Sequence, residues 1–318
     1  MEIDELKSKI SNLLRDTKSI MLFLVLQDDN GFKVKKADID NGETTDELNN
    51  LFRTRINELF SNEELSLISL SNADERKNAI YEYDYSEYPD KMSYIKDFDI
   101  NKAVNYDIFS FSNDSLSSLV GYIIYIGDMN NGIVCFKKHY PISVIKRGTF
   151  LIGKYDERFK KIDTDDIIRL NGDINLFKFE NTIYVLDIET IEKYMGFEGL
   201  IRNRANEALA SIEQTRLIDN MVSLKDASVD FSFSKKLSKV AEQSLIITKR
   251  IPNEKVINFS KNNPGLRNKF KYTDSGDKII LDTKSSRLAF IKLLNDDYLV
   301  SELTEQPYDS LAKDKIMI

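Results

Sequence analysis

The sequence predicts an α+β protein: an N-terminal mixed or antiparallel sheet with helices, followed by a mainly helical C-terminal domain with a few short strands. The chain has 318 residues, more than one compact core usually holds, which favours two domains. Short β-branched and aromatic runs separated by turn residues fill the first part, whereas apolar residues recur every three or four positions after Asp187. We therefore expect an acidic α+β sheet domain over residues 1–190 and a helix-rich basic domain over residues 191–318.

The first sixty residues predict a helix, a hairpin and a second helix. Apolar residues recur at helical spacing over residues 3–14. A β-branched run over residues 20–27 precedes the turn sequence Asp-Asp-Asn-Gly, which predicts the first strand of a hairpin. Thr44 and Glu47 have the spacing of a capping box, so we expect a helix that starts there and whose apolar stripe runs to Phe60.

Strand patterns dominate the rest of the first domain. Tyr81, Tyr83 and Tyr85 alternate with polar residues, which places the three tyrosines on one face of a strand that Pro89 stops. Asn- and Gly-containing turns separate six further runs. These runs predict strands over residues 117–126, 133–137, 149–155, 167–170, 174–179 and 182–186.

The second domain begins with a long helix, because apolar residues from Ile201 to Ile212 follow helical spacing. A further helix is predicted over residues 231–247, and Pro252 can start a third that runs through Lys261. A strand over residues 278–282, a helix over 286–294 and a strand over 298–303 complete the prediction.

Several classes of protein are excluded by composition. The single cysteine, Cys135, has no partner for an internal disulfide, and the single histidine, His139, leaves no His/Cys set for a structural zinc. No G-x-S-x-G sequence surrounds a serine, so a nucleophile elbow is excluded too. We expect no metal and no cofactor. The remaining classes of function are ligand binding, protein interaction and catalysis by carboxylates.

The N-terminal residues are charged and lack the apolar stretch of a signal peptide. The longest apolar runs, residues 20–26 and 119–126, are well short of the ~18 residues that a spanning helix needs. We therefore expect a cytoplasmic protein whose membrane contact, if any, comes through a partner.

Charge is divided unevenly along the chain, although the net charge is -7. Residues 1–100 carry 13 Lys/Arg and 22 Asp/Glu, whereas residues 201–318 carry 20 and 16. Within residues 235–292 there are 14 basic and 5 acidic side chains. A local basic surface attracts DNA phosphates even on an acidic protein, so this region is the candidate DNA-binding surface. The alternative is an ordinary solvated face.

The candidate contacts are basic residues that flank predicted helices, with aromatic residues interleaved for stacking or packing. No catalytic residue is predicted among them. They are Lys235, Lys236, Lys239, Lys249, Arg250, Lys261, Arg267, Lys269 and Lys271.

Two motifs come near to catalytic signatures. Residues 148–154 match G-x-x-x-x-G-K, but Tyr155 stands where a P-loop has Ser or Thr, and the pattern is strand-like, so we expect a hairpin. Asp187 and Glu189 follow a strand as in the first motif of DEDD exonucleases, which hold two magnesium ions. The later motifs of that family are missing, so we expect Asp187 to cap the helix that begins at Ile188, with a metal-dependent nuclease as the alternative.

The segments "SNADERKNAIYEYDYSEYPD" and "LFLVLQDDNGFKVKKADID" resemble the KwaB family of the bacterial Kiwa anti-phage defence system. The similarity runs through the whole chain, and its most specific element is the motif A-D-x-R-K-N-A-I-Y-E-Y-D. Without the resemblance, the charged residues around Glu75 would be interpreted as a polar turn before a strand. The motif carries no mechanism, so no catalytic residue can be transferred from it.

The resemblance implies a non-enzymatic DNA-binding effector that blocks phage DNA replication or transcription. It also implies a partner, the membrane protein KwaA, through which the protein would associate peripherally with the inner membrane. A homodimer is expected as well, with the long helix around residues 205–212 as a candidate surface.

Overall fold

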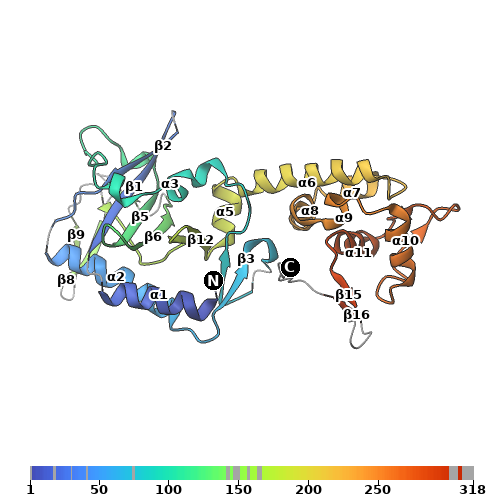
Figure 1. Cartoon of the computed structure of the whole chain (residues 1–318). Helices are drawn as coiled ribbons and strands as arrows, with labels where there is room; N and C mark the ends of the chain where they lie inside the picture. Colours follow the sequence, from blue (N-terminus) through green and yellow to red (C-terminus); the bar gives the residue numbers. More distant parts are fainter. Residues whose placement is uncertain are drawn as a thin grey trace. The chain divides into compact units, whose positions relative to one another are not determined.

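The computed structural model describes the backbone of residues 2–16, 19–29, 31–40, 42–73, 76–140, 144–145, 151–155, 158–162, 167–300 and 307–309. The chain divides into two compact units, Met1–Gly196 and Phe197–Ile318. A mixed sheet with helices forms the first unit, and helices with short strands form the second (Figure 1). The predicted α+β class is confirmed.

An eight-stranded sheet organises the first unit. Its strand order is β2-β1-β5-β6-β11-β12-β4-β3, and all neighbours are antiparallel except β3 and β4, which are parallel. In chain order the strands are β1 (Ile20–Asp28), β2 (Gly31–Lys36), β3 (Ser66–Ser69), β4 (Ala79–Glu82), β5 (Leu119–Gly127), β6 (Gly132–Lys138), β11 (Leu176–Phe179) and β12 (Thr182–Val185).

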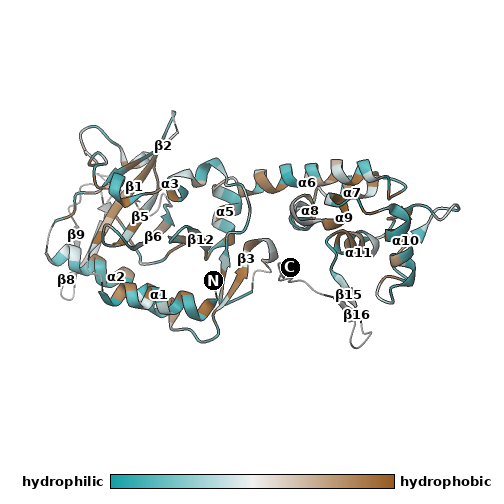
Figure 2. Ribbon diagram, viewed as in Figure 1, coloured by the Kyte–Doolittle hydropathy of each residue, from teal (hydrophilic) through white to brown (hydrophobic). Residues whose placement is uncertain are grey.

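Both faces of this sheet are covered. The helices α1 (Ile3–Asp16) and α2 (Glu43–Phe60) bury their apolar stripes against one face, in one core with alternate residues of β1 and β5. On the other face the Phe23 ring lies 5.2 Å from the ring of Phe98, between their centroids. Burial on both faces explains why β1 and β5 are continuous apolar runs, as Figure 2 shows.

Short helices complete the first unit. They are η1 (Leu70–Asn72), η2 (Asp90–Met92), α3 (Ser93–Lys96), α4 (Ile100–Ala103), η3 (Leu116–Ser118) and α5 (Ile188–Tyr194). Two strand pairs lie outside the main sheet: β7 (Val144–Ile145) with β10 (Ile167–Ile168), and β8 (Leu151–Tyr155) with β9 (Arg158–Ile162). The hairpin expected in place of a P-loop is therefore confirmed at β8, while residues 148–150 lie outside the described ranges.

Helices packed around one core form the second unit. α6 (Phe197–Thr215) and α8 (Phe231–Gln243) share that core with α11 (Lys284–Leu294). The remaining elements are α7 (Val222–Ala227), α9 (Leu245–Thr248), α10 (Asn253–Asn262), β13 (Lys271–Tyr272), β14 (Ile279–Ile280), β15 (Tyr298–Val300) and β16 (Pro307–Asp309).

Three local predictions in the chain are wrong. α2 begins at Glu43 after Gly42, whose φ is 106°, and no side chain caps it, so the capping box is absent. β4 ends at Glu82, so Tyr83 and Tyr85 lie beyond the strand, although both are buried. The helix expected over residues 231–247 is broken at Ser244, which has extended backbone and caps α9 instead.

The candidate dimer surface is also corrected. Ala205, Ala208, Leu209 and Ile212 are all buried in the core of the second unit, with at most 6% of their surface exposed. The apolar spacing that suggested an interface is therefore explained by packing within the unit.

Candidate functional site

Three of the nine predicted DNA contacts lie on α8. This helix buries Phe233, Leu237 and Val240, which leaves Lys236 exposed and Lys235 half-buried. Lys239 follows Lys235 by one turn and is half-buried as well. The Lys235 ammonium lies 5.4 Å from the centroid of the Phe231 ring, so its stem packs on the aromatic ring while its charge stays at the surface.

Lys249 and Arg250 occupy the turn that ends α9, and both are exposed. Arg250 has a φ of 49°, and the amide of Ile251 donates to the carbonyl of Ile246 at 3.0 Å. This is a Schellman ending, in which the left-handed position is usually glycine. An arginine held there costs backbone strain, which is common where a side chain has a function.

The other four predicted contacts lie on α10, β13 and the loop between them. Arg267 and Lys269 are exposed in the loop. The Lys261 ammonium donates to the carbonyl of Gly276 at 3.1 Å and lies 4.7 Å from the centroid of the Tyr272 ring. Lys271 forms an ion pair with Asp282 at 2.6 Å, which largely neutralises its charge locally.

Five of the nine side chains combine exposure with an unpaired charge. These residues make no ion pair with any other residue in the described part of the chain, so their charges are available to phosphates. They are Lys236, Lys249, Arg250, Arg267 and Lys269.

A cleft of about 430 Å³ beside Lys261 adds two cations that the sequence reasoning missed, Arg216 and Lys278. Its walls come from α10 and the β13–β14 hairpin, and they also contribute Asn258 and Asp277. Arg216 follows α6 with a φ of 56°, a second arginine in the left-handed conformation. A sequence signal could have identified Arg216. It stands at the end of a predicted helix, at the position where glycine is usually found.

A large cavity in the first unit joins the two motifs singled out in the sequence. It has a volume of about 630 Å³ and lies between α2, the loop before β4 and the start of α5. β4 runs antiparallel to β12, with Tyr81 opposite Val185, so the residues before β4 meet those after β12. Arg76 and Lys77 therefore line the same cavity as Asp187 and Glu189, a juxtaposition that the sequence reasoning did not predict.

Asp187 caps α5, as predicted. Its Oδ1 accepts from the Thr190 amide at 3.3 Å, and its Oδ2 accepts from the Thr190 hydroxyl at 2.7 Å and from the Asn175 side-chain amide at 2.8 Å. Glu189 is 2.7 Å from the ammonium of Lys193. Both oxygens of Asp187 are thus engaged by local donors, an arrangement that serves helix capping rather than metal ligation.

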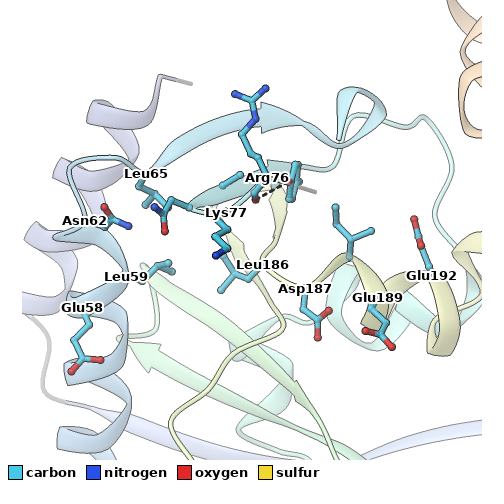
Figure 3. A pocket seen from close by; sticks show the side chains of 14 residues that line it. Glu58, Leu59, Asn62, Leu65, Arg76, Lys77, Leu186, Asp187, Glu189 and Glu192 are labelled. Carbon is cyan, nitrogen blue, oxygen red and sulfur yellow. Dashed lines mark hydrogen bonds between the residues drawn. The ribbon is translucent and has the colours of Figure 1, made fainter. Parts of the chain in front are cut away.

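Figure 3 shows that the charges of this cavity are dispersed. The Arg76 guanidinium points away from Asp187 and Glu189, and Glu58 projects from α2 on the opposite side. In the described ranges, no three His, Cys, Asp or Glu side chains gather so that they could hold a metal ion. Nor does any helix in those ranges have the length and apolarity to cross a membrane.

Comparisons with known proteins agree on one family. The family model described as "Kiwa protein KwaB-like" matches residues 116–304. The chain is also 29% identical over 319 residues to "Kiwa protein KwaB" of Escherichia coli O55:H7 (strain RM12579 / EPEC), which covers 99% of both chains. No solved structure matches the chain.

Proposed function

Because the chain belongs to the KwaB family of the Kiwa anti-phage defence system, we propose that it is a non-enzymatic effector that binds DNA through a basic face of its second unit. In this proposal the basic face is formed by Lys236, Lys249, Arg250, Arg267 and Lys269. Binding would block replication or transcription of phage DNA. Its expected partner is KwaA, which would hold it at the inner membrane, and a homodimer is the expected assembly.

The observation that carries the proposal is that five of the nine predicted contacts are exposed and have no carboxylate partner among the residues that the structure describes. Phosphate oxygens are strong acceptors, and each cation that neutralises a phosphate releases a counterion, so several such residues on one unit give sequence-tolerant affinity. Phe259, which is 37% exposed on α10, adds an aromatic surface on which a base can stack.

The test is a gel shift with duplex DNA of arbitrary sequence at fixed salt. A variant with Lys249→Glu and Arg250→Glu should bind at least tenfold more weakly, because two unpaired cations become anions. Lys102→Glu, at an exposed lysine of α4 in the first unit, is the control and should bind like the parent. If the double variant stays folded and binds like the parent, the basic face is not the DNA-binding surface.

No observation in the large cavity favours the alternative of a nuclease that uses Asp187 and Glu189. A plasmid-cleavage assay with Mg²⁺ or Mn²⁺, run on the same preparation as the gel shift, separates the two functions. We expect retarded but uncut DNA.

A further inference from the structure

The eight-stranded sheet of the first unit ends in two edge strands that differ in their protection. β2 carries Lys33, Lys35 and Lys36. Its end is also covered, since the main chain of Lys36 bonds to Asp107 and Phe109, at 2.9 Å each. Lysines and covering segments are common means of keeping an edge strand from pairing with another chain. β3, at the other edge, has the sequence Ser-Leu-Ile-Ser and carries no charge, so it is the less protected edge.

The main-chain groups of β3 point alternately toward β4 and toward the open edge. The Ser66 amide donates to the Asn78 carbonyl at 2.9 Å, as expected for the parallel pairing with β4. Because this direction alternates along a strand, Ile68 also faces β4, whereas Leu67 and Ser69 direct their amides outward. No strand in the described part of the chain pairs with these outward groups. They are therefore available to a strand of another molecule.

The residues of β3 suit a second copy of the same strand. Leu67 packs against the core that the sheet shares with α1 and α2, so Ile68 lies on the opposite face, where it is half-buried. In an antiparallel pairing about a two-fold axis at Ile68, Leu67 of each copy lies opposite Ser69 of the other and exchanges main-chain hydrogen bonds with it. The two Ile68 side chains then face each other and cover apolar surface that is exposed in one copy alone.

Charge and symmetry both favour a second copy as the occupant of this edge. A charged edge strand repels its own copy across a two-fold axis, whereas β3 has no charge to repel. The nearest carboxylate, that of Glu64, accepts from the side-chain amide of Asn78 at 3.0 Å, and this register places Glu64 opposite Asn72 of the second copy rather than opposite another acid. Leu67 and Ser69 lie symmetrically about Ile68, so one axis engages the outward groups of both residues in both copies.

We propose that β3 is the homodimer interface of this protein, formed by antiparallel pairing of two β3 strands about a two-fold axis at Ile68. The proposal rests on the homodimer expected under the proposed function and supplies a surface for it, since the residues of α6 first considered are buried in the second unit. The two eight-stranded sheets would continue as one sheet through the interface. None of the five cations of the basic face takes part in it.

Ser69→Pro tests the interface with little change to the monomer. The φ of Ser69 is -59°, which proline adopts without strain, and the Ser69 side chain makes no capping hydrogen bond to η1. Sedimentation velocity of the full chain over a range of concentrations should show that the parent dimerises. Ser69→Pro should raise the dissociation constant of the dimer by about tenfold or more, because the proline ring replaces an amide donor at the interface. Ser69→Ala keeps the amide and should dimerise like the parent.

Cysteine cross-linking tests the register of the pairing. The two Ile68 residues would form a non-hydrogen-bonded pair with Cα atoms about 4.5 Å apart, which a disulfide can bridge. Ile68→Cys should therefore give a disulfide-linked dimer under mild oxidation, seen on a non-reducing gel. Ser66→Cys is the control and should not cross-link, because the two Ser66 positions would be about 13 Å apart along the strands. The native Cys135 is buried and does not interfere.

A parent that stays monomeric up to about 100 μM would overturn the proposal, and this is also the result expected if β3 pairs with a strand of another protein. Ser69→Pro that is folded by circular dichroism and dimerises as tightly as the parent would overturn it too, as would equal cross-linking of Ile68→Cys and Ser66→Cys.

The dimer and DNA binding are tested separately. Folded Ser69→Pro should still retard duplex DNA at saturating protein, because the cations of the basic face are unchanged. A protein that dimerises through β3 without binding DNA would contradict the proposed function alone, whereas one that binds DNA as a monomer would contradict the interface alone.

Discussion

Arg250 is held in a backbone conformation that favours glycine, yet it is exposed and carries one of the charges of the proposed basic face. A left-handed non-glycine residue costs about 1–2 kcal/mol, and glycine recovers part of this while losing more chain entropy on folding. Arg250→Gly should therefore raise the free energy of unfolding by up to about 1 kcal/mol and at the same time weaken DNA binding. Thermal melting and a gel shift on one preparation measure both effects.

Arg250→Lys is the matched control, because it keeps both the charge and the strain. It should melt and bind close to the parent. If Arg250→Gly binds DNA as tightly as the parent, the residue has no role in recognition, and its strained backbone is only a feature of the helix ending.

The capping role of Asp187 leads to a second prediction at the same scale. Asp187→Asn combined with Glu189→Gln should leave DNA binding and defence intact. It should lower stability by about 1 kcal/mol, because an amide nitrogen in place of one carboxylate oxygen cannot accept the hydrogen bonds that Oδ2 takes from Asn175 and the Thr190 hydroxyl. Melting, gel shifts and phage plaque counts provide the measurements. Loss of defence in a variant whose melting is unchanged would support the nuclease alternative.

Single residues were predictable where their role is local. The helix α5 begins at the residue after Asp187, so the capping role can be inferred from the neighbouring sequence alone. The pairing of Lys271 with Asp282 depends on how the β13–β14 hairpin folds back, and the cavity that joins Arg76 to Asp187 depends on the pairing of β4 with β12. Such contacts come from tertiary structure, which periodicity does not encode.

Among the elements, the break between α8 and α9 depends on Ser244. Its hydroxyl accepts from the Ile247 amide at 3.3 Å and donates to the buried carbonyl of Leu294 at 2.6 Å. Ser244→Ala should destabilise the second unit by about 2 kcal/mol, since it removes a cap and leaves the carbonyl without that donor. Denaturant unfolding checks this, with Ser232→Ala on exposed α8 surface as the control.

The opposite result would be informative. If Ser244→Ala leaves stability unchanged, α8 and α9 can join as the one helix that the apolar spacing suggested. The helix pattern alone could not show the break, because serine in a helix and serine at a cap are equally compatible with the surrounding apolar residues.

Strand lengths show the same limit. β1 and β5 were predictable as long apolar runs because burial on both faces removes polar residues from them. The length of β4 was overestimated. The amide of Tyr83 still donates to the carbonyl of Ile183 in β12, but the next acidic residue, Asp84, accepts from the amide and the hydroxyl of Ser71. These bonds turn the chain toward η1 and end the pairing with β12. The alternating tyrosines continue past the strand because they are buried in the loop as well.

For the whole molecule, the division into two compact units makes fragments testable. Residues 197–318 should retain DNA binding, whereas residues 1–196, with ten more acidic than basic side chains, should not. Circular dichroism establishes that each fragment is folded, and a gel shift measures binding. A folded N-terminal fragment that binds as tightly as the full chain would point to Lys33, Lys35 and Lys36 on the first hairpin instead.

The central claim is that a face of unpaired cations in the second unit binds the phosphate backbone. The most direct measurement is the affinity of the full chain for duplex DNA as a function of salt. If about six phosphates are neutralised, affinity should fall by ~10³ or more between 50 and 200 mM salt, with little dependence on DNA sequence. An affinity that stays flat over this range would contradict the account.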